Sequence, residues 1–256
     1  MPTERGTLML TLKSLADRFE SADFLIGDPS YAMHSVHGGR NQEVAAFIAS
    51  CLSYGSRAQF LPKIEHIMTI SARDTYSWVA EGRFTDDFPP TDECFYRLYK
   101  FRDMNTMLQT LRRMITDHHS IGEYVRANAH DGFSALQALT SYFAKHGSGG
   151  IIPKNTASPC KRLCMFLRWM VRDASPVDLG LWSSFIDKRT LIIPMDTHVI
   201  HEAAALGLLN GRSATMAAAI RLTQRLAKTF PDDPLKGDFA LFGRGVYSAN
   251  NVPEAF

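Results

Sequence analysis

The hydrophobic residues of this chain recur mostly at the spacing of an amphipathic α-helix. After Asn41, apolar residues fall at positions i, i+3, i+4, i+7 and i+8, namely Val44, Phe47, Ile48, Cys51 and Leu52. This spacing predicts a helix that is buried along one face, capped by Asn41 and ended near Gly55. Similar patterns predict helices after Ser56 and over residues 8–22, 103–117, 131–146, 213–229 and 234–247. Strand-like alternation is nearly absent, so we expect an all-α fold.

The composition narrows the class of protein without assigning a function. The chain has 256 residues, enough for one large or two small domains with a substantial core. Its 45% hydrophobic and 21% charged residues are ordinary for a globular protein. The net charge of +2 neither requires nor excludes an acidic partner. The first residues lack a signal-peptide pattern and no run approaches ~18 apolar residues, so we expect a cytoplasmic protein without membrane contact.

The four cysteines form neither a CxxC pair nor a framework typical of secreted proteins. They are Cys51, Cys94, Cys160 and Cys164. We therefore expect reduced thiols. Cys160 and Cys164 lie one helical turn apart, but two further ligands at suitable spacing are not evident, so packing is favoured over metal binding. We predict neither a metal nor another cofactor.

A basic helix is predicted to begin at Ser158 and Pro159, because serine is a preferred N-cap and proline a preferred first helical residue. Its apolar face consists of Leu163, Phe166, Leu167, Met170 and Val171. Helical projection places Lys161, Arg168 and Arg172 on the opposite side, with few acidic residues nearby in the sequence. This stripe is either a solvated face or a surface that binds phosphates.

Two residues of the C-terminal half, Lys161 and Asp196, are candidates for chemistry. Lys161 falls in a first helical turn, where the positive partial charge normally favours Asp or Glu. A lysine whose charged form is disfavoured can act as a nucleophile. Asp196 opens a helical pattern that Gly207 closes. Helix capping alone explains an aspartate at that place, so a further role depends on the surrounding segments.

These two positions resemble those of the helix-hairpin-helix DNA glycosylases of the endonuclease III superfamily. In that superfamily a lysine at a helix start attacks the sugar carbon of a flipped nucleotide, and an aspartate stands in a D-T-H-like segment at a later helix start. Lys161 and residues 196–199 match these positions. Residues 239–244 and 43–56 are similar to the helix that ends in H-G-R and to the helix before the loop that probes DNA. The resemblance covers most of residues 41–248.

A longer combination of segments resembles a bacterial family described only as a conserved domain of unknown function. The segments that match are residues 161–172, residues 178–182, the segment around Asp196 and residues 233–242. That family looks like a divergent branch of the glycosylase superfamily. The archaeal 8-oxoguanine glycosylases are its nearest characterised analogue, because they also have a longer insertion between the lysine and the aspartate.

The chain departs from the superfamily pattern at three places. The L-P-G-V-G hairpin, whose backbone N–H groups bind a DNA phosphate in the superfamily, is missing before the lysine. Residues 153–159 stand in its place, so the resemblance does not identify the groups that would bind that phosphate. The four-cysteine iron–sulfur motif is also missing, so no cluster is expected. The probing loop, residues 53–57, lacks the glutamine of many relatives. Tyr54 or Arg57 is a candidate to fill the gap left by a flipped base.

The resemblance implies a fold, an activity and a partner. The fold is a single two-lobed helical unit over residues 1–256, with the site in the cleft between the lobes. Lobe one covers about residues 41–150, and lobe two about 151–248 plus the N-terminal helices in 8–40. The implied protein is a monomer that removes a damaged base, with 8-oxoguanine favoured by analogy, from double-stranded DNA and can cleave the abasic strand.

The implied site residues fall into three groups. Catalysis is assigned to Lys161 and Asp196. DNA contacts are assigned to Arg57, Arg162, Arg168 and Arg172. The base pocket or wedge is assigned to Tyr54, Trp169, Trp182, His198 and Asp238, with core packing as the alternative for the tryptophans and a structural role for His198. The first alternative is that the chain is a non-catalytic nucleic-acid-binding protein on the same scaffold. The second is that it is a helical protein that binds other partners.

Overall fold

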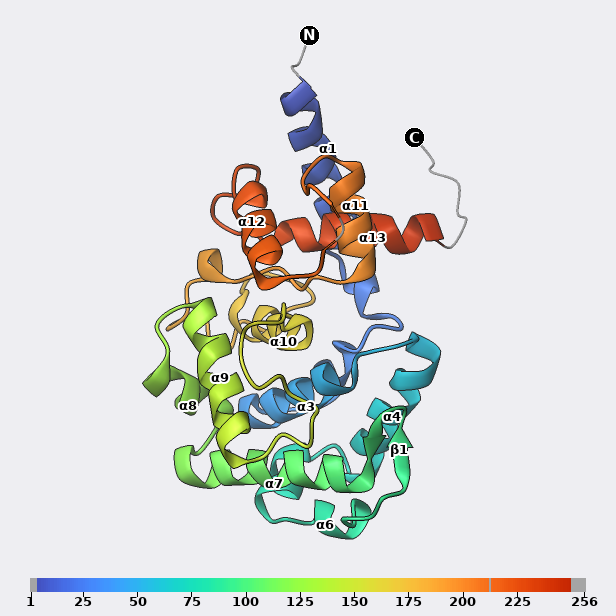
Figure 1. The fold of residues 1–256 in the computed structure, drawn as a ribbon, viewed down its shortest axis with the longest axis vertical. Helices are drawn as coiled ribbons and strands as arrows, with labels where there is room; N and C mark the ends of the chain where they lie inside the picture. Colours follow the sequence, from blue (N-terminus) through green and yellow to red (C-terminus); the bar gives the residue numbers. More distant parts are fainter. Residues whose placement is uncertain (1–3, 212, 250–256) are drawn as a thin grey trace. The chain divides into compact units, whose positions relative to one another are not determined.

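A computed structural model describes residues 4–211 and 213–249 (Figure 1). The described residues form thirteen α-helices, two 3₁₀ turns and one two-stranded hairpin. The predicted helical class is therefore confirmed, with the hairpin as an exception. A two-lobed arrangement like that of a glycosylase stays a prediction. Among the described residues, no helix is long and apolar enough to cross a membrane.

The chain divides into two compact units. The first consists of Met1–Phe24 together with Ala157–Phe256, and the second of Leu25–Thr156. Described segments near both ends of the sequence thus belong to the same compact unit. The lobe bounds expected from the sequence stay a prediction.

The second unit is built around a central helix, α3. Its α-helices are α2 (Tyr31–His34), α3 (Gly39–Leu52), α4 (Arg57–Ile70), α5 (Thr75–Ala80), α6 (Phe84–Asp87), α7 (Phe101–His118), α8 (Ile121–Asn128) and α9 (Gly132–His146). The antiparallel strands β1 (Cys94–Tyr96) and β2 (Tyr99–Lys100) form the hairpin. Helix α3 contacts α2, α4, α5 and α8. The ring of Phe47 on α3 stacks on that of Phe143 at 5.3 Å.

Two expectations for α3 were wrong in detail. The helix begins at Gly39, so Asn41 is not its cap. The Asn41 side chain instead accepts hydrogen bonds from Thr75 Oγ1 at 2.7 Å and from the Tyr76 N–H at 3.2 Å, which ties α3 to α5. Every residue over 43–52 is buried, not only one face. The alanines within this stretch are small, so neighbouring helices can pack against more than one side.

The first unit packs its last helix between the first helix and α11. Its α-helices are α1 (Glu4–Phe19), α10 (Lys161–Val171), α11 (Thr197–Ala205), α12 (Met216–Leu226) and α13 (Lys236–Ala249). The 3₁₀ turns are η1 (Ala22–Leu25), which ends in the second unit, and η2 (Lys188–Thr190). Helix α13 contacts α1 and α11. A Cβ at Gly243 would lie 2.2 Å from the Phe19 ring, and one at Gly245 would lie 2.9 Å from His198 Cβ. These glycines permit the close packing of both neighbours.

Replacing Gly149 by alanine is expected to destabilise the second unit strongly. Gly149 has φ of +57° and a Cβ there would lie 2.1 Å from the backbone oxygen of Asp103. We expect a loss of about 3 kcal/mol, from the left-handed backbone and the clash together. Gly150→Ala is the matched control, because Gly150 has φ of +72° with no atom within 4 Å of its Cβ. It should cost only about 1 kcal/mol. Equal losses in urea unfolding would show that the close approach is unimportant.

Candidate active site

Lys161 is the first residue of α10, one position after a turn in the chain. The expected start at Ser158 and Pro159 was wrong by two residues, because Cys160 adopts a left-handed conformation with φ of +48° and interrupts the helix there. The residue at the N-cap, Cys160, makes no side-chain hydrogen bond to the first turn of α10. Lys161 therefore lies at the start of a helix, and its side chain is 34% exposed.

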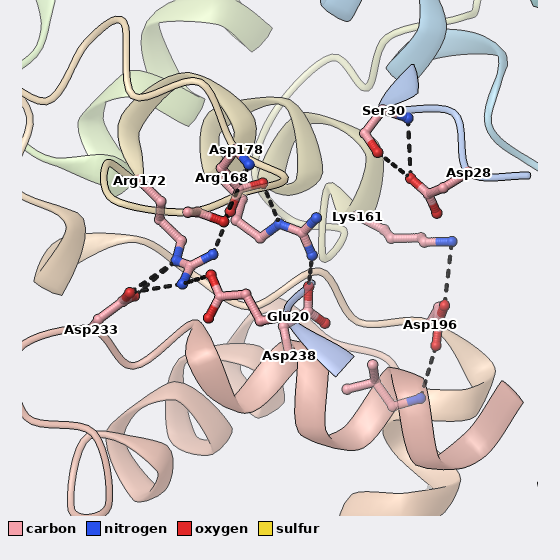
Figure 2. A network of polar contacts seen from close by, with 12 residues as sticks. Glu20, Asp28, Ser30, Lys161, Arg168, Arg172, Asp178, Asp196, Asp233 and Asp238 are labelled. Carbon is pink, nitrogen blue, oxygen red and sulfur yellow. Dashed lines mark hydrogen bonds and ion pairs between the residues drawn. The ribbon is translucent and has the colours of Figure 1, made fainter. Parts of the chain in front are cut away.

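Asp196 caps α11, as its sequence context predicts. Its Oδ1 accepts a hydrogen bond from the Val199 N–H at 2.8 Å. The helix ends at Ala205 and Gly207 follows with φ of +68°, in agreement with the expected end. The other oxygen, Oδ2, lies 3.6 Å from Lys161 Nζ (Figure 2). The structure thus brings together the two residues to which the family resemblance assigned catalysis.

Arg168 and Arg172 do not form the exposed basic stripe expected from helical projection. Their side chains are 5% and 1% exposed. Arg168 donates from Nε to Asp178 Oδ1 at 3.2 Å and from Nη1 to Asp238 Oδ2 at 2.5 Å. The compensating acids lie outside α10, Asp178 in the loop that follows it and Asp238 far away in the sequence, so a projection of this helix cannot reveal them. Both guanidinium groups are engaged inside the protein, so their assignment to DNA contacts was wrong.

Arg172 is surrounded by three carboxylates. Its guanidinium donates to Glu20 Oε1 at 2.7 Å, to Asp233 at 2.8–3.1 Å and to Asp178 (Figure 2). Burial alone would lower the pKa of Arg172, but these carboxylates raise it, Asp178 most strongly. We call the six residues the buried ion-pair network. They are Glu20, Arg168, Arg172, Asp178, Asp233 and Asp238.

Asp238 is the member of this network whose pKa also responds to the charge of Asp196. It lies in the first turn of α13, is 3% exposed, and accepts the hydrogen bond from Arg168. Burial raises the pKa of Asp238 to about 6; Arg168 opposes this shift, and the charge of Asp196 adds to it. The charge of Asp196 therefore disfavours the ionised form of Asp238. In the structure Asp238 is thus a buried ion-pair partner of Arg168, which its assignment to a base pocket did not predict.

The two tryptophans are core residues. Trp169 is 0% and Trp182 1% exposed. The Trp182 ring meets that of Phe166 edge-on at 5.3 Å. Trp169 Nε1 has no hydrogen-bond partner among the described residues. Neither ring is exposed for stacking on a base, which favours the core-packing alternative for both.

The remaining assigned residues of the first unit lie beside the pair at helix starts. Arg162 follows Lys161 on α10 and is partly exposed. His198 is in the first turn of α11, half-buried, with its ring 6.1 Å from that of Phe242. On the same helix, Glu202 is buried and pairs with Arg244 of α13 at 3.2 Å. This ion pair joins α11 to α13.

Tyr54 and Arg57 belong to the second unit, separate from Lys161 and Asp196. Arg57 begins α4 and pairs with Asp28 at 3.1 Å. The Tyr54 hydroxyl donates to the Tyr96 carbonyl at 3.3 Å. Tyr54 therefore contacts the hairpin, which limits its freedom to act as a wedge.

The hairpin turn is a feature that sequence reasoning missed. Leu98 at the turn is 84% exposed, and its N–H donates to the Tyr54 hydroxyl at 3.2 Å. A Cβ at Gly55 would lie 2.6 Å from Arg97 Nη1, so this glycine allows Arg97 to approach the loop. Strands of three and two residues are too short to show alternation. The only sequence feature that favoured strands here was the run of aromatic residues within 95–99, because aromatic residues are enriched in strands.

The cysteines and the potential metal ligands among the described residues add no reactive group to this site. The four cysteines are free thiols, and burial raises the pKa of Cys160 and of Cys164. Buried thiols of raised pKa are poor nucleophiles. Within the described residues, no group of three or more His, Cys, Asp or Glu side chains could hold a metal ion.

The comparisons with known proteins give a family without an assigned activity. Residues 28–247 match the family described as "Protein of unknown function (DUF2400)", and the chain belongs to this family. A search of the curated proteins found no match. A search of the solved structures also found none. The expected membership of a family of unknown function is confirmed, whereas the link to DNA glycosylases stays a prediction.

Proposed function

We propose that this protein is a DNA glycosylase with lyase activity, which excises a damaged base from double-stranded DNA through Lys161 and Asp196. One observation carries the proposal: Lys161 Nζ lies 3.6 Å from Asp196 Oδ2. Each residue stands at a helix start. The side chain of Lys161 is 34% exposed, so it is not enclosed in the core. An amine beside a carboxylate is suited to nucleophilic attack followed by proton transfer.

The damaged nucleotide must leave the base stack before the amine can reach its sugar, at a cost of a few kcal/mol. Neutral Lys161 then attacks C1′ of the deoxyribose. The bond from C1′ to the base breaks, and its electron pair leaves with the base, which gains a proton. The amine passes a proton to Asp196, which returns it to O4′ as the C1′–O4′ bond breaks. The open sugar is then a protonated imine. Loss of a proton from C2′ then expels the 3′ phosphate and cleaves the strand.

Asp196 has two tasks in this scheme. Its carboxylate stabilises the positive charge that develops on the sugar, as carboxylates do for oxocarbenium-like transition states. It also accepts the proton that Lys161 loses. The hydrogen bond from the Val199 N–H to Oδ1 holds the side chain, while Oδ2 faces the amine. The helix cap therefore also orients the catalytic carboxylate.

The alternative, a non-catalytic nucleic-acid-binding protein, is less well supported. It relied on a basic stripe of Arg162, Arg168 and Arg172. The last two are buried in ion pairs, so only Arg162 of the three is partly exposed. Steep salt dependence of DNA affinity is expected under either hypothesis and would exclude a protein that binds other partners.

Borohydride trapping tests the proposal, because borohydride reduces the imine to a stable secondary amine and so joins protein to DNA. The duplexes carry 8-oxoguanine, an oxidised pyrimidine or an abasic site. A covalent adduct is expected, and the preferred duplex identifies the lesion. No adduct on any duplex, with the protein folded and bound to DNA, would favour the non-catalytic hypothesis.

Asp196→Asn is expected to reduce base excision by roughly 10²–10³-fold, because the carboxylate charge that stabilises the transition state is lost. Asparagine is itself a good N-cap, so the melting temperature should change little. Asp131→Asn is the matched control, since Asp131 caps α9 in the same way, accepting from the Ser134 N–H at 2.7 Å. Single-turnover excision measures both variants. Near-normal excision by Asp196→Asn would show that Asp196 acts only as a helix cap and has no catalytic role.

A further inference from the structure

Lys161 and Asp196 belong to two helices that hardly contact each other. Lys161 begins α10 and Asp196 caps α11. Among the described elements, these two helices share at most isolated contacts. The ion pair of Lys161 with Asp196, at 3.6 Å, is partly exposed, and such pairs hold protein segments together only weakly. Other contacts must therefore keep the amine beside the carboxylate.

Helix α13 is joined to both α10 and α11 by ion pairs. In its first turn, Asp238 accepts a hydrogen bond from Arg168 of α10 at 2.5 Å (Figure 2). Roughly two turns later on α13, the Nε atom of Arg244 lies 3.2 Å from Oε2 of Glu202, a residue of α11. Three of these four side chains are buried, namely those of Arg168, Glu202 and Asp238. Helix α13 therefore connects the helix of the amine to the helix of the carboxylate.

Close steric fit adds to the contact between α11 and α13. A Cβ at Gly245 would lie 2.9 Å from His198 Cβ, nearer than two such carbons approach in real structures. The two helices also pack on each other along their length. His198 comes two residues after Asp196, so the close approach lies beside the helix cap. A change in the spacing of α11 and α13 at this point therefore moves the Asp196 carboxylate.

Together these contacts form a path from the amine to the carboxylate through three helices. The residues along this path are, in order, Lys161, Arg168, Asp238, Arg244, Glu202 and Asp196. We propose that α13 sets the distance between the Lys161 amine and the Asp196 carboxylate. Arg244 is a positioning residue, and it acts through Glu202 on the direction of α11. The catalytic consequence rests on the proposed function, but the effect on geometry does not.

The test of geometry is a nuclear Overhauser contact between side-chain protons of Lys161 and Asp196, in the full chain with isotope-enriched lysine and aspartate. The two signals are identified by their absence in Lys161→Gln and Asp196→Asn. We expect the contact in the natural protein and a clear loss of its intensity in Arg244→Met, because methionine offers no cation to Glu202. An intensity unchanged in Arg244→Met, or no contact in the natural protein, overturns the proposal.

Lys188→Met is the matched control for the loss of a cation. The side chain of Lys188 is 30% exposed, against 29% for Arg244, and it pairs with Asp173 elsewhere in the same unit. It should keep the contact, and an equal loss in both variants overturns the proposal. If Arg244→Met does not fold, the double variant with Glu202→Gln leaves no buried charge without its partner. The double variant should lose the contact in the same way.

Gly245→Ala tests the same joint between α11 and α13 without changing a charge. The added methyl group pushes on His198 Cβ and so on the start of α11. We expect it to weaken the contact between the two side chains of the site. Gly243→Ala is the matched control on the same helix, because its methyl group would meet the Phe19 ring of α1 instead. Equal weakening by both variants would attribute the effect to general damage and overturn the proposal.

Single-turnover trapping on an abasic duplex measures the catalytic consequence. At saturating duplex, Arg244→Met should reduce the rate roughly ten- to a hundredfold, because misplacement by about 1 Å can cost about a hundredfold. The duplex concentration that gives half of the maximal rate should change little. Arg244→Lys keeps a cation opposite Glu202 and should recover part of the rate.

Two results separate the positioning role of Arg244 from the proposed function. An unchanged maximal rate in Arg244→Met, or an effect on the half-maximal duplex concentration alone, would overturn the positioning role while the adduct still supports a glycosylase. A contact between Lys161 and Asp196 that depends on Arg244, without any adduct in the natural protein, would refute the proposed function and support the role of α13.

Discussion

Lys161→Gln is expected to abolish covalent trapping, with at least a roughly 10³-fold loss, because glutamine has no amine to form the imine. The change also removes one partner of the pair with Asp196, whose side chain is 11% exposed. DNA affinity should change little, since Lys161 is one cation among those that face solvent. Trapping on the abasic duplex and filter binding at fixed salt measure the two properties separately.

Lys188→Gln is the matched control for this variant. Lys188 is 30% exposed and pairs with Asp173 at 2.5 Å in the same unit of the chain. The substitution therefore removes a comparable lysine–aspartate pair away from the site, and it should leave trapping unchanged. A Lys161→Gln protein that still forms the adduct would refute the nucleophile role. Equal losses in both variants would attribute the effect to damaged structure.

Arg172→Met is expected to lower the free energy of unfolding by about 3–5 kcal/mol, the cost of removing one partner from a buried ion pair. Arg172 is 1% exposed and donates to Glu20, Asp178 and Asp233. Methionine fills much of the volume but leaves these carboxylates without their shared cation. Urea unfolding at pH 7 measures the loss. The carboxylates will be forced to take up protons, so the loss should be smaller in acidic solution.

Arg189→Met is the control for an arginine in an exposed pair. Arg189 is 62% exposed and pairs with Asp187 at 2.5 Å. Exposed pairs contribute about 0–1 kcal/mol, so this variant should unfold almost as the natural protein does. Arg172→Lys keeps the charge but lacks the forked donors, and we expect an intermediate loss. A loss below about 1 kcal/mol for Arg172→Met would show that the network is not important for stability.

The buried ion-pair network also explains how the fold holds the proposed site in place. Arg168 and Arg172 fasten α10 to the segments that contain Glu20, Asp178 and Asp238. Lys161 is at the start of that same helix. Because the helix is rigid over this length, fixing its last turns also fixes the direction of its first. We therefore expect the network to influence the geometry of the Lys161–Asp196 pair as well as stability.

The local structure around the candidate site can be predicted from the amino-acid sequence. Asp196 as a helix cap, the helix closed by Gly207, and Lys161 in the first turn of a helix were all predicted and are found. The helical class followed from the spacing of apolar residues. These features depend on residues within one or two turns of each other, so they are visible without the rest of the chain.

The pairing of charges and the burial of rings, by contrast, follow from contacts in three dimensions that the sequence does not show. The projection of α10 could not show that Arg168 and Arg172 face carboxylates, because the partners of Arg172 include Glu20 and Asp233, far away in the sequence. It also could not show that Lys161 Nζ and Asp196 Oδ2 lie 3.6 Å apart. Ion pairing and burial depend on contacts between distant segments, and local periodicity carries no information about those contacts.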